Sequence, residues 1–160
     1  MLSSRIGTGR ARRVLAAAAA FAALASAPTL AGTVNEVNGL AIKGYDPVAY
    51  FTEGRPVDGS PEFAATHEGA TFEFASAANR DLFVADPGRY APRYGGFCAF
   101  GTSGGYKAGI DPRAFTIVND RLYLNYNLDV RQEWSKDVPG HITKADANWP
   151  MVQSLTDVYR

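Results

Sequence analysis

The N-terminal leader decides how much of this chain is left to fold. Four arginines lie within the first 13 residues, an apolar run follows at Val14–Ala25, and the small residues Ala25-Ser26-Ala27 close the segment. A basic region, an apolar region and a small-residue site in this order are typical of a secretory signal peptide. The apolar run has 12 residues, whereas a membrane-spanning helix needs roughly 18 or more. We therefore expect residues 1–31 to be removed and no stable membrane span to remain.

A signal peptide predicts an exported protein, periplasmic or secreted. General secretion explains the leader, and Arg12-Arg13 is also compatible with the twin-arginine route. The part that follows has about 130 residues, the usual size of one domain. It carries 12 basic and 16 acidic side chains, a net charge of −4. A nucleic-acid binder needs a basic surface, so we expect no nucleic-acid partner.

A single cysteine, Cys98, stands in a chain predicted to reach an oxidising compartment. It cannot form a disulfide within the chain, so the fold has to be stable through its core alone. An unpaired cysteine in an exported protein suggests a reactive thiol, a metal ligand or pairing with another molecule. The alternative is a buried cysteine that acts as a small apolar side chain.

Periodicity predicts a strand followed by a helix in the first half of the folded part. Ala70–Phe74 alternates, with Phe72 and Phe74 on one face, and Ser76 is a candidate N-cap for a helix that ends near Asp86 before Pro87. We expect Leu82 and Phe83 of this helix to pack against the two phenylalanines.

The second half predicts a β-hairpin and two short helices. Phe115–Val118 and Leu122–Tyr126 alternate around Asn119-Asp120, two residues that tolerate positive φ. A helix is expected at Leu128–Lys136 with Asn127 as its cap, and a second at Ile142–Ala147 after a break at Val138-Pro139-Gly140. These patterns together predict one small α+β domain, with a few antiparallel strands packed against short helices.

The segment Gly95–Gly109 holds six glycines and Cys98 but lacks the spacing of a dinucleotide or phosphate-binding motif. Its glycines allow the backbone to approach other backbone or a small ligand closely.

Three blocks of sequence together resemble exported YHS-domain proteins. They are Gly44–Phe51 (GYDPVAYF), Gly69–Ser76 with the Asn79, Arg80, Phe83, Asp86-Pro87 and Tyr90 that follow, and Lys144–Pro150 (KADANWP). The resemblance covers about residues 40–150 and leaves residues 151–160 as a C-terminal tail. It implies a small α+β domain, in agreement with the pattern above.

The resemblance also bears on metal binding. YHS domains of metal-handling proteins carry cysteines that are thought to bind copper or other soft metals, but Ala49 and Ala75 occupy the matching places here. That site therefore does not carry over. Cys98 remains, in a Tyr94–Cys98 motif (YGGFC) that belongs to the exported branch.

The remaining candidate residues are few. A thiolate and an imidazole suit copper-like metals, so we take Cys98 and His67 as candidate metal ligands, although no metal-ligand spacing supports them. The tyrosines form either core or an apolar pocket with polar tips, and for a pocket we select Tyr45, Tyr94 and Gly96 as candidate contacts to a bound small ligand.

We therefore expect a non-enzymatic exported binding module for a metal ion, copper-like, or a metal-bearing small ligand near Cys98. Two alternatives stay open: a thiol redox protein that uses Cys98, and a structural or interaction domain without a ligand. The sequence points to no particular protein partner.

Overall fold

The computed structural model describes residues 32–160, so the predicted signal peptide at residues 1–31 lies outside the described part. The chain begins with a four-stranded sheet in the order β1-β2-β4-β3. Its strands are β1 (Glu36–Val37), β2 (Leu40–Ala41), β3 (Ser60–His67) and β4 (Ala70–Phe74). Strands β3 and β4 form an antiparallel hairpin, and β2 runs parallel to β4 on its other side.

The first half also holds four short helical segments: η1 (Ile42–Gly44), α1 (Ala49–Thr52), α2 (Ala77–Ala85) and α3 (Pro87–Tyr90). The predicted cap of α2 is confirmed, because the Ser76 hydroxyl accepts a hydrogen bond from the Asn79 N–H at 3.1 Å. The ring of Phe83 lies 4.9 Å from that of Phe72, also as expected. The expectation for Leu82 is wrong, since this side chain is 42% exposed. Consecutive helical residues point about 100° apart, so only one of the two can face the sheet.

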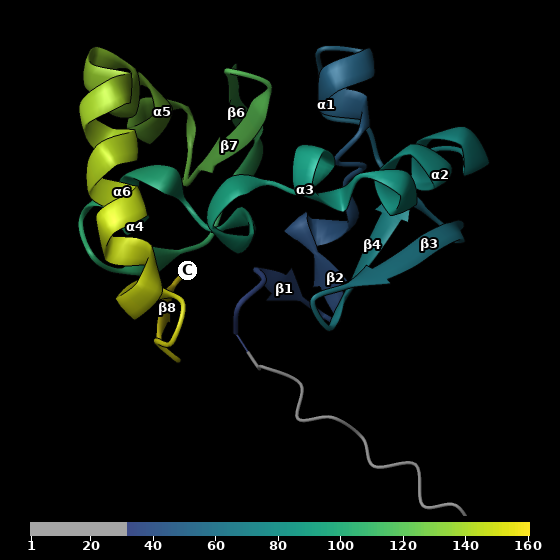
Figure 1. Cartoon of the computed structure of the whole chain (residues 1–160), viewed down its shortest axis with the longest axis horizontal. Helices are drawn as coiled ribbons and strands as arrows, with labels where there is room; N and C mark the ends of the chain where they lie inside the picture. Colours follow the sequence, from purple (N-terminus) through teal and green to yellow (C-terminus); the bar gives the residue numbers. More distant parts are fainter. Residues whose placement is uncertain (1–31) are drawn as a thin grey trace, which may run out of the picture.

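The second half is built around the hairpin of β6 (Asp111–Val118) and β7 (Arg121–Asn125). The predicted turn is confirmed, with Asn119 and Asp120 at φ values of 50° and 59°. The helical segments here are η2 (Arg93–Gly96), α4 (Ala99–Ser103), α5 (Leu128–Trp134), η3 (Ser135–Asp137) and α6 (Val138–Val152). Figure 1 shows the two halves side by side, with α4, α5 and α6 gathered at the hairpin.

Helix α6 corrects one expectation. The sequence predicts a break at Val138-Pro139-Gly140, but these residues form the first turn of a helix that continues to Val152. Proline fits the first turn because no N–H is needed there. Asp137 caps the turn by accepting a hydrogen bond from the Gly140 N–H at 3.0 Å. The cap of α5 is as predicted, with Asn127 accepting from the Val130 N–H at 2.8 Å.

Asp46 joins two of the segments that carry the YHS resemblance. One oxygen of this buried carboxylate accepts hydrogen bonds from the N–H groups of Val48 and Ala49, at 2.8 and 3.2 Å. The other oxygen accepts from the Ala75 N–H at 2.9 Å and the Asn79 side chain at 2.7 Å. The α1 turn is thereby held at the start of α2.

One apolar core runs through both halves, which makes the protein a small single α+β domain. Ile42, Phe72 and Phe83 of the first half belong to the same buried cluster as Leu122 and Leu124 of β7. A second cluster, around Tyr94 and Trp134, lies between the hairpin and α6. Among residues 32–160, no helix combines the length and the apolar character needed to cross a membrane.

The two ends of the described chain lie close together. After α6, strand β8 (Val158–Tyr159) pairs in parallel with β5 (Lys107–Ala108). The Arg160 guanidinium donates to the side-chain oxygen of Asn35 and to the carbonyl of Glu36, both at 3.3 Å. The predicted C-terminal tail, residues 151–160, thus completes α6 and contributes a strand.

Candidate functional site

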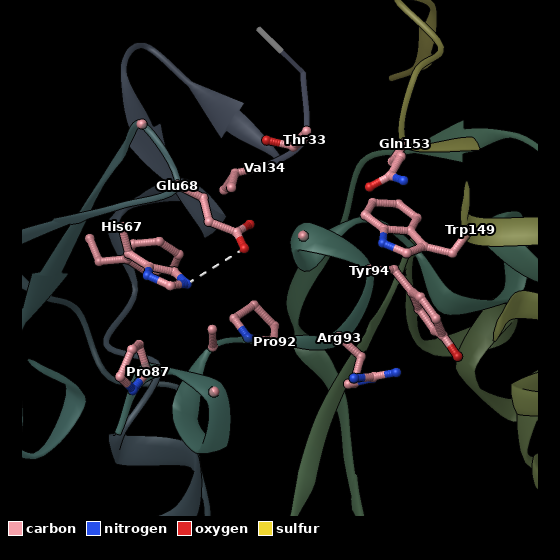
Figure 2. A pocket seen from close by; sticks show the side chains of 15 residues that line it. Thr33, Val34, His67, Glu68, Pro87, Pro92, Arg93, Tyr94, Trp149 and Gln153 are labelled. Atoms are coloured by element: carbon pink, nitrogen blue, oxygen red, sulfur yellow. Dashed lines mark ion pairs between the residues drawn. The ribbon is translucent and has the colours of Figure 1, made fainter. Parts of the chain in front are cut away.

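A pocket of about 600 Å³ lies where the β3–β4 hairpin, the N-terminal segment, η2 and α6 meet (Figure 2). Its volume is within the range of roughly 300–1,000 Å³ that small-molecule sites occupy. The pocket is lined by Thr33, Val34, His67, Glu68, Gly69, Phe72, Pro87, Gly88, Ala91, Pro92, Arg93, Tyr94, Gly95, Trp149 and Gln153.

The hairpin supplies His67 and Glu68 to one wall. His67 is the last residue of β3, its ring lies edge-on to that of Phe83 at 5.6 Å, and its side chain is 27% exposed. Its Nε2 is 3.9 Å from a carboxylate oxygen of Glu68, the first residue of the turn. In Figure 2 this carboxylate points into the space between the walls.

The opposite wall is formed by α6 and η2. The Trp149 indole lies 5.8 Å from the ring of Tyr94, and Figure 2 shows the indole facing Glu68 across the pocket. The Tyr94 hydroxyl donates a hydrogen bond to Asp146 of α6 at 2.9 Å, which fixes η2 against this helix. Burial, assisted by this hydrogen bond, raises the pKa of Tyr94. The hydroxyl therefore remains a protonated donor in the folded protein.

Glycine is required where the N-terminal segment crosses η2. Gly95 has a φ of 59°, and a Cβ there would lie 1.8 Å from the carbonyl oxygen of Thr33. The backbones of the two segments are joined by a hydrogen bond from the Asn35 N–H to the Gly95 carbonyl at 2.8 Å. This close approach brings Thr33 and Val34 into the pocket wall.

The structure thus places two of the predicted site residues, His67 and Tyr94, at one pocket. Gly96 is adjacent, but a Cβ there would meet Ile42 of the core at 2.6 Å. Tyr45 is outside the pocket wall, in a bridge with Asp58. The predicted ligand contacts of Gly96 and Tyr45 stay predictions.

Cys98 faces the core. Its side chain is 1% exposed, and its sulfur accepts from the Gly101 N–H at 3.4 Å and donates to the Asn125 side chain at 3.6 Å. Burial raises the pKa of this thiol. Cys98 does not line the pocket that holds His67, so the two predicted metal ligands do not meet there, and the predicted copper ion at Cys98 stays a prediction. Within residues 32–160, no three His, Cys, Asp or Glu side chains form a group that could hold a metal.

Glu68, Arg93 and Trp149 of the pocket were not predicted as site residues. They come from a turn, a 3-10 segment and a helix that are far apart in the sequence. Only Glu68 carries a local signal. The turn residues Glu68 and Gly69 have φ values of 51° and 82°, a conformation that favours asparagine or glycine, so a glutamate is unusual there.

A second hollow, of about 840 Å³, lies between the N-terminal segment and β6. Of its three basic side chains, Lys43, Arg113 and Arg160, two are engaged: Arg113 pairs with Asp111 at 2.7 Å, and Arg160 binds Asn35. In the pocket at His67 and Trp149, the polar ends of the side chains face the cavity. This pocket is therefore the candidate site.

Comparison with protein-family models, with curated proteins and with solved structures gives no match for this chain. The likeness to exported YHS-domain proteins therefore stays a resemblance carried by the quoted motifs.

Proposed function

We propose that the protein is a binding module that takes a small molecule in the pocket between the β3–β4 hairpin and α6. The observation that carries the proposal is the composition of the two walls. Aromatic and apolar groups, Trp149 and Phe72 among them, surround a few polar tips such as those of Glu68 and His67. This combination is the usual form of a small-ligand site.

The surroundings of the pocket support a rigid, preformed site. Tyr94 is tied to α6 through Asp146, and the N-terminal segment is tied to η2 through Asn35. A preformed pocket binds without a large ordering cost. The resemblance to exported YHS-domain proteins and the predicted export agree with a soluble ligand that meets the protein outside the cytoplasm.

A nitrogen-15 NMR screen with small soluble fragments of all charges tests the proposal. We expect shift changes concentrated at the Trp149 indole N–H, the Gly95 amide and their neighbours. Trp149→Leu should weaken the best fragments at least about threefold, because it removes an aromatic surface worth about 1 kcal/mol. Met151→Leu is the matched control, since Met151 is exposed on the same helix and does not line the pocket. Shifts that avoid the pocket, or equal effects of both variants, would reject the proposal.

A further inference from the structure

The charge balance of the pocket indicates what kind of molecule it binds. Two ionic side chains of fixed sign line the pocket, Glu68 and Arg93. Arg93 pairs with Asp146 at 3.3 Å, and its guanidinium lies 5.7 Å from the centre of the Tyr94 ring. Its positive charge is therefore balanced by a carboxylate of the same protein.

No arginine or lysine neutralises the Glu68 carboxylate in the described part of the chain. Its closest partner there is the His67 imidazole at 3.9 Å, which is beyond hydrogen-bond distance. The carboxylate is 59% exposed and directed toward the space between the walls (Figure 2). The pocket thus presents a negative group that a bound cation would neutralise.

An aromatic wall faces this carboxylate. The Trp149 indole is held in position by the buried ring of Tyr94 at 5.8 Å. Indole is the aromatic side chain that attracts cations most strongly, and aromatic walls recognise substituted ammonium groups. A carboxylate on one side and an indole on the other match an organic cation better than a neutral or anionic molecule.

The conformation of the β3–β4 turn does not explain why position 68 holds a glutamate. In the β6–β7 hairpin, the residues at positive φ are Asn119 and Asp120, which tolerate this conformation. In the β3–β4 hairpin, the first such position holds Glu68, at a φ of 51°. Glutamate is not favoured in the left-handed region, so the conformation of the turn gives no reason for a glutamate at this position.

We infer that the pocket takes a small organic cation, with its substituted ammonium group between the Glu68 carboxylate and the Trp149 indole. This inference rests on the proposed function and adds the ligand class to it. The net charge of −4 on residues 32–160 favours the approach of cations to the protein in general.

Three probes of the same shape test the inference: choline, its neutral analogue 3,3-dimethylbutan-1-ol, and the anion 3,3-dimethylbutanoate. Each is titrated into the protein lacking residues 1–31 while the Trp149 indole N–H is followed by NMR. Choline should bind roughly tenfold more tightly than the neutral alcohol, and the anion should bind most weakly. In Glu68→Gln the preference for choline over the alcohol should fall below about threefold. Glu62 is an exposed residue of β3 outside the pocket, so Glu62→Gln should keep the preference.

Equal binding of choline and the alcohol, no binding of choline, or a preference unchanged in Glu68→Gln would overturn the inference. The fragment screen separates this failure from that of the proposed function. If fragments bind in the pocket without preferring positive charge, the binding function stands and the ligand class is wrong. If no fragment binds there, both are wrong.

Discussion

At the scale of single residues, Cys98 has both of its hydrogen-bonding roles occupied inside the protein, by Gly101 and Asn125. Its thiol is buried, and burial raises its pKa. We therefore expect the native protein to react with a disulfide reagent at pH 8 on the order of 100-fold more slowly than the protein in denaturant, because thiolate and access are both needed. Absorbance of the released thiol measures the rate.

Fast labelling of the native protein would contradict this prediction and favour the thiol redox alternative. The predicted copper site is tested separately, by competition of the protein with a Cu(I) chelator. If Cys98 binds copper, the wild-type protein should compete with the chelator for Cu(I) better than Cys98→Ser does. Equal competition by the two proteins would reject it.

At the scale of elements, helix α2 is attached to the first sheet through one face. Phe83 lies against Phe72 and Phe74, with ring centres at 4.9 and 5.1 Å. Phe83→Ala should lower the free energy of unfolding by about 3–5 kcal/mol, as buried aromatic truncations do. Leu82→Ala, at the exposed neighbouring position, should lower it by less than about 1 kcal/mol. Urea titrations of both variants decide the point, and equal losses would mean that the helix is rotated.

Lys107 of β5 connects the two ends of the described part of the chain, residues 32–160. Its buried ammonium group donates to the carbonyls of Gln153 and Leu155, at 2.9 and 2.6 Å, and to that of Gly32. It also lies 4.9 Å from the centre of the Phe97 ring. The end of α6 and the segment that enters the pocket wall thus share one cation.

Lys107→Met should lower the free energy of unfolding by about 2–4 kcal/mol, because it leaves partly buried carbonyls without their charged donor. Lys136→Met is the control, since Lys136 pairs with Glu133 on the surface and should change stability by less than about 0.5 kcal/mol. Denaturant titration measures both, and a near-zero effect at Lys107 would show that the two ends do not depend on it.

At the scale of the whole molecule, buried tyrosine and cysteine side chains predict that the folded protein loses stability at alkaline pH. Burial raises the pKa values of Tyr50 and Tyr94 above the ordinary value of 10.0, and that of Cys98 is raised in the same way. Above about pH 8.5 to 10, these groups lose protons in the unfolded chain but keep them in the folded one. The folded state then binds more protons, so the free energy of unfolding should fall as pH rises, by up to about 1.4 kcal/mol per pH unit for each group.

Urea titrations from pH 8 to pH 11, with a reductant present, measure this fall. Tyr50→Phe should show a shallower decrease above about pH 10, because it lacks one of the ionisable hydroxyls. A constant stability across this range would contradict the prediction.

The sequence alone determined the features that depend on neighbouring residues. Period-2 alternation and the positive-φ residues Asn119 and Asp120 determine the β6–β7 hairpin, and Ser76 and Asn127 determine where two helices begin. These signals are local, because a strand face, a turn and a cap each involve residues within a few positions of one another. The α+β class follows from them.

The tertiary structure decided which faces and which distant segments meet. It exposed Leu82 and buried Phe83, and it made Val138-Pro139-Gly140 the start of α6 instead of a break. The pocket is the clearest case, since Glu68 and Trp149 face each other only because the hairpin and α6 pack around η2. No periodicity encodes such a contact, because it depends on how separate elements pack and on glycine at position 95, where the Thr33 backbone leaves no space for a Cβ.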